Sequence, residues 1–190
     1  MSKERFYKVD LTPCYNKRMV FPREEITEDM GNDGVGIDKR TFFDFNKTIE
    51  LDGVEYIFRQ SNSMDCIICN NQNILLPPTA FHKLHILGFM FWGANSDYLK
   101  LNYVNGKNEN AKVFFNDWSA AYNILDINFF DTPVEKGFKT VETFFSCGKL
   151  KIPLYLHHCE YDNPANEKLE SITLPDNMHM FILAMTLEGR

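Results

Sequence analysis

Two short turn sequences constrain the fold most strongly, because each lies between segments of strand-forming residues. Asp52-Gly53 separates residues 47–51 from residues 54–59, and Asn105-Gly106 separates residues 98–104 from residues 112–115. Asp-Gly and Asn-Gly are preferred in two-residue hairpin turns, where φ must be positive. The sequence therefore predicts two β-hairpins, the second with a few polar residues lengthening its connection.

The segments beside these turns alternate between apolar and polar residues. Leu99, Leu101 and Tyr103 alternate with polar positions, which is typical of a strand with one buried face. In the first hairpin, the residues expected to share one face are Val54, Tyr56 and Phe58.

Residues 81–91 are apolar at nearly every position apart from two histidines and a lysine. This pattern is typical of a strand covered on both faces, with a buried helix as the alternative. The strand is favoured because Pro77-Pro78 blocks a helix just upstream and Gly88 interrupts the run. Further strands are predicted over residues 149–158, 170–174 and 180–187.

Many short strands with turn signals, and no segment with a convincing helical stripe, predict an all-β fold. We expect two antiparallel sheets in one β-sandwich of jelly-roll type, forming a single domain over residues 1–190. The 44% of apolar residues supply a large core without disulfides or metals. The five cysteines are an odd number without a secretory signal, so no structural disulfide is expected.

Charge and hydropathy exclude some partners. The net charge of −6 argues against nucleic acid, which requires clustered Lys and Arg. Residues 1–5 are charged and lead into no apolar stretch of signal-peptide length, and no apolar run approaches the ~20 residues of a membrane-spanning helix. We therefore expect a cytoplasmic protein that binds neither nucleic acid nor membrane.

Cys66-Ile67-Ile68-Cys69 is a weak candidate for a zinc or redox motif. If residues 65–70 form a strand, the two thiols point to opposite faces and cannot ligate one ion. His157 and His158 face opposite ways on a strand by the same argument. We interpret the cysteines as buried small hydrophobic residues.

The histidines His82, His85, His157 and His158 are the candidates for catalysis. With nearby carboxylates in one pocket they would support a small hydrolase or isomerase acting on sugars. The common hydrolase, metalloprotease and nucleotide-binding motifs are absent from the sequence. A catalytic function is therefore less favoured than a binding function.

Residues 28–38 are rich in oxygen-bearing side chains of the kind that calcium favours. Their spacing fits no EF-hand, and a solvated acidic loop is the alternative. No other cofactor is predicted. The candidate calcium ligands are Asp29, Asn32, Asp33 and Asp38.

Aromatic residues near turns form a candidate ligand-binding set. Sugar rings have apolar faces that stack on aromatic side chains, while their hydroxyls take polar partners. Core packing is the alternative for the same aromatic residues. The candidate binding residues are Trp92, Asn95, Asp97, Tyr98, Trp118 and Tyr161.

The order of several short segments resembles the galactose-binding-domain-like β-sandwich modules of bacterial carbohydrate-active enzymes. The resemblance implies a jelly-roll fold and a non-catalytic role beside glycan-processing domains, sometimes with a structural calcium ion. The segments are Phe43-Asp44-Phe45, Leu51-Asp52-Gly53-Val54-Glu55-Tyr56, Leu75-Leu76-Pro77-Pro78, Lys83-Leu84-His85-Ile86-Leu87-Gly88, Tyr103-Val104-Asn105-Gly106, Asn116-Asp117-Trp118, Ser171-Ile172-Thr173-Leu174-Pro175-Asp176 and residues 181–187.

The sequence differs from such modules in carrying neither a secretion signal nor a catalytic domain. We therefore expect a free-standing, intracellular carbohydrate-binding-like module. The alternative is a protein-interaction or assembly subunit, for example a homodimer, that has lost sugar binding. The exposure of Trp92 and Trp118 discriminates between these hypotheses, because stacking on a sugar requires an exposed ring.

Overall fold

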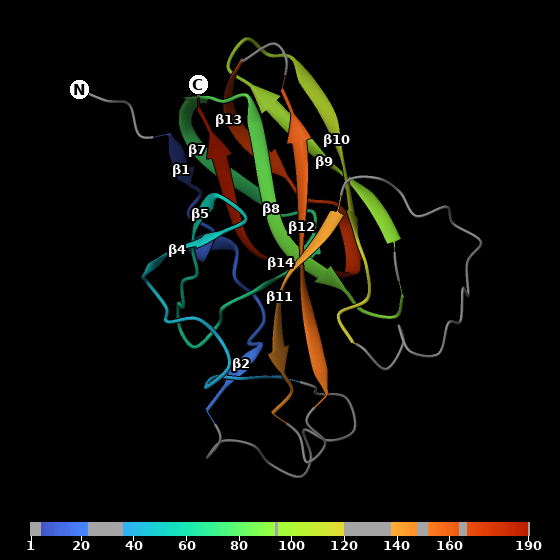
Figure 1. Cartoon of the computed structure of the whole chain (residues 1–190). Helices are drawn as coiled ribbons and strands as arrows, with labels where there is room; N and C mark the ends of the chain where they lie inside the picture. Colours follow the sequence, from blue (N-terminus) through green and yellow to red (C-terminus); the bar gives the residue numbers. More distant parts are fainter. Residues whose placement is uncertain are drawn as a thin grey trace.

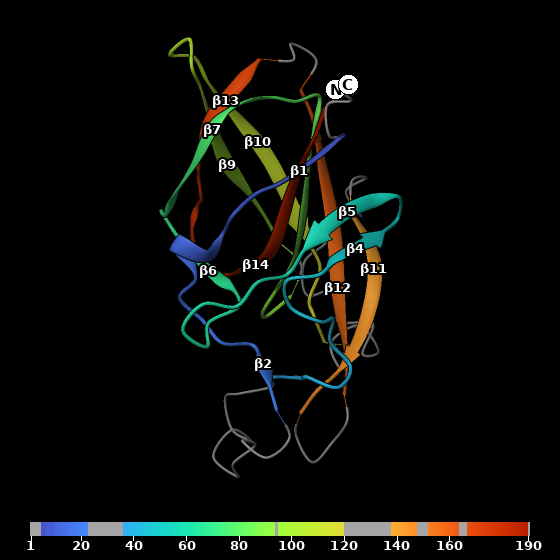
Figure 2. The same cartoon turned by 90° about the vertical axis from the view of Figure 1, so that its left-hand side faces the viewer.

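The computed structural model describes residues 5–22, 36–93, 95–119, 138–147, 152–163 and 167–189. Their longer strands form two antiparallel sheets that pack against each other (Figures 1 and 2). The predicted all-β, two-sheet β-sandwich is confirmed. Within these residues, the single helical element is the 3-10 turn η1 (Thr12–Cys14).

The larger sheet has six strands, and β8 lies in the middle of their order. β14 pairs with β1, β8 and β6, and β12 joins β8 to β11 at the other side. The strands of this sheet are β1 (Phe6–Lys8), β6 (Ile67–Asn70), β8 (Lys83–Met90), β11 (Phe138–Phe145), β12 (Pro153–Asp162) and β14 (Asp176–Glu188).

The smaller sheet has four strands in the order β10-β9-β13-β7. Two short pairs complete the structure: β2 with β3 is parallel, and β4 with β5 is a hairpin. The strands are β2 (Val20–Phe21), β3 (Ile37–Asp38), β4 (Thr48–Leu51), β5 (Val54–Ile57), β7 (Asn73–Ala80), β9 (Asn95–Tyr103), β10 (Asn108–Phe115) and β13 (Lys168–Thr173).

The larger sheet is covered on both faces. One apolar cluster lies between the two sheets, and a second lies on the opposite face of the larger sheet, under β5 and the chain around β2 and β3. In Figure 2 the β4-β5 hairpin lies on the side of this sheet away from β7, β9, β10 and β13. Along β8, Leu84 and Ile86 enter the first cluster while Leu87 and Phe89 enter the second. This arrangement confirms the prediction for residues 81–91.

Both hairpins are present, with one difference. Asp52 and Gly53 have φ angles of 54° and 78°, as the two-residue turn requires. In the second hairpin Gly106 has a φ of 80°, and the Tyr103 N–H donates to the Lys107 carbonyl. The connection is thus longer than a two-residue turn. Its strands are also longer than predicted, because the polar residues 108–110 pair with residues 100–102.

Residues 73–80 form strand β7, which was not predicted because it contains Pro77 and Pro78. β7 is an edge strand that pairs only with β13 among the described strands. Its register shifts between the Leu169–Thr79 and Ser171–Leu75 pairs, and Pro77 and Pro78 lie in that gap. Proline is tolerated there because edge strands and bulges leave backbone donors unpaired.

The last two predicted strands lie in different sheets. β13 belongs to the smaller sheet and β14 to the larger one, so the chain crosses between sheets at Leu174-Pro175. The strand predicted over residues 149–158 is β12, which continues to Asp162. Residues 148–151 lie outside the described chain.

The cysteines carry free thiols. Cys66 lies in the second apolar cluster and Cys69 in the first, so the two thiols point to opposite faces of the larger sheet. Burial raises the pKa of both thiols. In the described part of the chain, no helix has the length and hydropathy needed to cross a membrane.

Candidate functional site

Trp92 lies on the turn that follows β8, and its side chain is 72% exposed. Its φ angle is 67°, a left-handed conformation that bulky residues rarely adopt. Residues held in such conformations occur preferentially at functional sites, where the surrounding structure enforces them. Trp92 is therefore the most informative of the predicted binding residues.

Buried hydrogen bonds hold this turn in place. The Asp117 carboxylate accepts the backbone N–H of Gly93 at 2.7 Å and that of Ser119 at 2.8 Å. The Trp118 N–H donates to the Met90 carbonyl at 3.1 Å. Burial raises the pKa of Asp117, although the backbone hydrogen bonds oppose this shift. The turn that carries Trp92 is thus anchored to the core.

Polar and apolar residues lie on the strands that adjoin the turn carrying Trp92. Asp97 Oδ2 accepts a hydrogen bond from Asn177 Nδ2 at 3.1 Å, which links β9 of the smaller sheet to β14 of the larger one. The Met90–Met180 pair and the hydrogen bond from Phe91 N–H to the His179 carbonyl continue the β8–β14 ladder towards Trp92 and Met178. Met178 is 70% exposed. We call Trp92, Asn95, Asp97, Asn177 and Met178 the Trp92 rim.

The other predicted aromatic residues do not join this rim. Tyr98 is 53% exposed and points to the outer face of β9, opposite Lys112. Trp118 is only 3% exposed, because its ring stacks on Phe89 with centroids 5.1 Å apart. It therefore serves core packing and cannot stack on a ligand.

Tyr161 lies near the opposite end of the sandwich. It pairs with Leu84 and packs against the core between the sheets. Burial and a hydrogen bond with Glu109 raise the pKa of its hydroxyl. The six residues predicted as one site thus occupy several places.

Of the four candidate calcium ligands, Asp38 is the one that lies within the described residues. Asp38 is buried, and its carboxylate pairs with the Arg40 guanidinium, whose Nε lies 3.0 Å from Asp38 Oδ1. Asp29, Asn32 and Asp33 lie outside the described residues.

A second polar site lies at the other end of β8, on the face covered by the β4-β5 hairpin. His85 Nδ1 lies 3.1 Å from His158 Nε2, and His85 Nε2 lies 3.0 Å from Glu188 Oε2. Arg5 donates to the other oxygen of Glu188, with Nε at 2.8 Å and Nη2 at 2.6 Å. These contacts connect Arg5, just before β1, to side chains on β14, β8 and β12, and we call Arg5, Glu188, His85 and His158 the His85 network.

Burial favours the neutral form of both imidazoles in this network. Burial lowers the pKa of His85, and burial together with the adjacent His85 lowers that of His158 to about 4. Burial favours a higher pKa for Glu188, but hydrogen bonds from Arg5 and His85 outweigh it and the net pKa is lowered. Glu188 is therefore an ionised acceptor, which places the His85 proton on Nε2.

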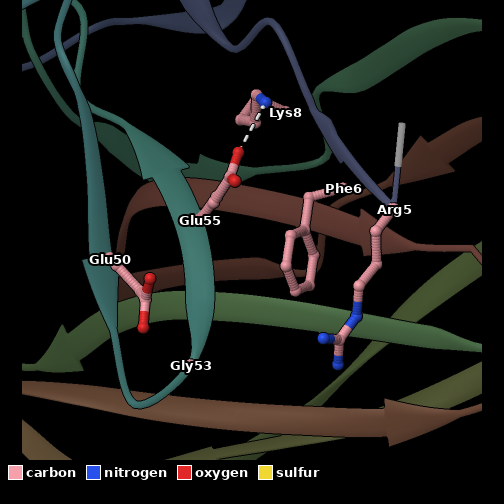
Figure 3. Close-up of a pocket in the computed structure, with 6 residues that line it drawn as sticks. All are labelled: Arg5, Phe6, Lys8, Glu50, Gly53 and Glu55. Atoms are coloured by element: carbon pink, nitrogen blue, oxygen red, sulfur yellow. Dashed lines mark hydrogen bonds and ion pairs between the residues drawn. The ribbon is translucent and has the colours of Figure 1, made fainter. Parts of the chain in front are cut away.

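An open pocket of about 540 Å³ adjoins the His85 network at Arg5. Figure 3 shows Glu50, Gly53 and Glu55 on the hairpin side, with Arg5 and Phe6 on the β1 side. Lys8 forms an ion pair with Glu55 across the pocket at 3.0 Å. The pocket thus has charges of both signs beside an apolar ring.

The four candidate histidines separate into two groups. His85 and His158 adjoin each other, and His82 Nε2 lies 3.9 Å from Glu188 Oε2. His157 faces the opposite way, towards the Asp117 carbonyl. Sequence reasoning missed Glu188, Arg5 and Met178, because their roles depend on strand pairings over long sequence distances.

Comparison with known proteins relates the sequence to a domain family. Residues 8–190 match the model of a family described as the AziU2-like beta-sandwich domain. The match spans nearly the whole chain and agrees with the sandwich observed here. No curated protein matches the sequence.

Proposed function

Since the chain belongs to the AziU2-like beta-sandwich domain family, whose description names a fold and no reaction, we propose that it is a non-catalytic binding module for a carbohydrate. In this proposal the module is cytoplasmic, and the Trp92 rim is its ligand site. The observation that carries the proposal is the exposed ring of Trp92, whose backbone φ is positive. The buried carboxylate of Asp117 anchors this turn through the N–H of Gly93.

The chemistry of the rim supports a polyhydroxylated ligand. The apolar face of a sugar stacks on an exposed indole, and its hydroxyls exchange hydrogen bonds with carboxylates and amides. Asn95 and Asp97 supply such groups on β9, and Asn177 supplies another on β14. The resemblance to galactose-binding-domain-like modules points to the same class of ligand.

Thermal unfolding of the purified protein against a panel of mono- and oligosaccharides, with and without calcium, tests the proposal. A ligand at 100 times its dissociation constant stabilises the folded state by about 2.7 kcal/mol. For a chain of this size that corresponds to a rise in Tm of roughly 5–10 °C. Trp92→Ala should abolish the rise, whereas Leu75→Ala, at a 76% exposed position outside the rim, should preserve it. No response to any sugar would overturn the proposal.

A second candidate function is assembly with another protein, such as a second copy of the chain. The observation that favours it is the exposure of both Met178 and Trp92, because methionine adapts to protein surfaces and contributes little to sugar binding. Sedimentation velocity tests this candidate. A dimer that dissociates on Trp92→Asp, in a protein without any sugar response, would support assembly, whereas a monomer at all concentrations would exclude self-association.

A further inference from the structure

We propose that His85, His158 and Glu160 form a binding site for a divalent transition metal such as Zn²⁺. The three side chains project from β8 and β12 on the face of the larger sheet that carries the β4-β5 hairpin. One ligand atom from each lies within 4.8 Å of the other two. Two imidazoles and one carboxylate are a common set of protein ligands for zinc, with the fourth position left open.

Strand register brings these ligands together. Glu160 pairs directly with His85, and His158 pairs with Leu87, two residues further along the same two strands. Side chains two residues apart on a strand share a face, so His158 and Glu160 both lie beside His85. The site therefore rests on two adjacent strands at the centre of a sheet, which hold the metal ligands more rigidly than a loop would.

The separation of the two imidazoles suits a shared ion. His85 Nδ1 and His158 Nε2 are 3.1 Å apart, close to the ~3.3 Å expected for two ligands 2.0–2.1 Å from one tetrahedral zinc ion. Without metal, the Nε2–H of His158 donates to the unprotonated Nδ1 of His85. On metal binding the His158 proton occupies Nδ1 instead, so both facing nitrogens offer lone pairs and no net proton is released.

A carboxylate orients His85 for this role. Glu188 Oε2 accepts the Nε2–H of His85 at 3.0 Å, and Arg5 fixes the same carboxylate from the other side. Metal-ligating histidines commonly donate their second N–H to a carboxylate, which sets the tautomer and raises the basicity of the ligand. This contact aims the His85 Nδ1 lone pair at the proposed ion.

The charges around the site permit Glu160 to turn towards the metal. Glu160 is exposed and pairs with Lys83 at 3.0 Å, but Lys83 also lies 3.6 Å from Asp162. Lys83 therefore keeps an anionic partner when Glu160 binds the ion. Lys139 pairs with Asp52 at 2.6 Å, and Arg5 pairs with Glu188.

The metal site is independent of the proposed sugar site. His85 and Trp92 are separated by seven residues at opposite ends of β8, or about 23 Å along an extended strand. Failure of sugar binding therefore leaves the metal proposal standing, and the converse also holds.

Equilibrium titration of the full chain with Co²⁺ and Zn²⁺, monitored by visible absorption and calorimetry, tests the inference. The expected result is one ion per chain, with the visible bands of a four-coordinate Co²⁺ and no thiolate charge-transfer band. His158→Gln and His85→Gln should each lower the affinity by at least ~100-fold, and Glu188→Gln by about 10–100-fold. His179→Gln, at an exposed position on β14, is the matched control and should bind as the wild type does.

Glu160→Gln keeps the inference falsifiable if a buried histidine variant fails to fold. Glu160 is exposed, so this variant should retain its Tm and yet lose Co²⁺ affinity and change the absorption bands. Absence of stoichiometric binding by the wild type would overturn the inference. Binding that is unchanged in Glu160→Gln and in every folded histidine variant would overturn it equally.

Discussion

The buried carboxylate of Asp117 accepts the backbone N–H of Gly93 at 2.7 Å. It thereby fixes the turn in which the neighbouring residue, Trp92, is exposed to solvent. Asp117→Ala should leave the partly buried N–H of Gly93 and the buried N–H of Ser119 without acceptors and lower the free energy of unfolding by about 2 kcal/mol. Urea unfolding measures this change. Asp44→Ala, at a solvent-exposed carboxylate, is the control and should leave stability nearly unchanged. Equal stability of the two variants would contradict the anchoring role of Asp117.

The positive φ of Trp92 should cost stability. Trp92→Gly should raise the free energy of unfolding by roughly 0.5–1 kcal/mol, because glycine adopts this conformation without steric strain and the exposed indole contributes little packing. Trp92→Ala should give less or no gain, since alanine keeps a Cβ. Denaturant unfolding of both variants checks the order. A loss of stability in Trp92→Gly would show that the ring packs more tightly than its exposure indicates.

Gly88 lies where β8 meets both clusters, and it has no room for a side chain. A Cβ there would lie 2.2 Å from the Phe181 carbonyl oxygen and 2.8 Å from the Phe115 ring. Because backbone cannot move aside cheaply, Gly88→Ala should lower the free energy of unfolding by about 3 kcal/mol or more. Gly53→Ala is the comparison: it meets no atom within 4 Å and should cost only about 1–2 kcal/mol through its positive φ. Thermal unfolding of the two variants should separate them clearly.

The buried carboxyl of Asp65 makes stability depend on pH. It accepts the backbone N–H groups of Met19 and Val20, yet burial raises its pKa from 3.8 to about 6. A folded-state pKa above the unfolded one gives stability that is complete below about pH 4 and lost as the pH rises through 6. The loss amounts to about 3 kcal/mol at most.

Asp65→Asn should remove this dependence. We expect the difference in unfolding free energy between wild type and variant, measured by urea titration from pH 4 to pH 7, to change by up to about 3 kcal/mol in the variant's favour. The variant loses a hydrogen-bond acceptor, so its absolute stability should be lower at acid pH. Parallel pH profiles would show that Asp65 titrates normally.

The thiols should react in an order set by burial. Burial raises the pKa of Cys14, Cys66 and Cys69, but Cys14 is half-buried whereas Cys66 and Cys69 lie in the core. In the native protein a thiol reagent should therefore modify Cys14 first and leave Cys66 and Cys69 unmodified, since the thiolate is the reactive form. All five should react in denaturant. Fewer than five reactive thiols in denaturant without reductant would reveal a disulfide.

The strands that could be predicted are those with strong local signals. The Asp52-Gly53 turn and the alternation of Leu99, Leu101 and Tyr103 are properties of a few adjacent residues, and both predictions were confirmed. β7 was missed because its prolines are compatible with a strand only at an edge, and edge position is a property of the assembled sheet. The apolar cluster on the face of the larger sheet away from the smaller sheet was also not predicted. It combines short segments such as β2 and β3, which meet only in the folded protein.

In the candidate sites, too, some features could be predicted from neighbouring residues and others could not. Exposure of Trp92 follows from its polar neighbours in the sequence, whereas burial of Trp118 follows from its stacking on Phe89. The contact between His85 and His158 joins residues 73 positions apart, and that of His85 with Glu188 joins residues 103 positions apart. Such contacts depend on register across three strands, which no local pattern encodes.

The three strand pairings of β14 also have a consequence for how the protein is made. β14 comprises residues 176–188 and pairs with β1, β6 and β8, all of which precede it in the chain. A ribosome therefore synthesises most of the chain before these strands can acquire their common neighbour. Until then, the apolar edges of β8 and β1 stay open to pairing with other nascent chains. High expression at elevated temperature should accordingly favour aggregates, and slower synthesis should favour the native sandwich.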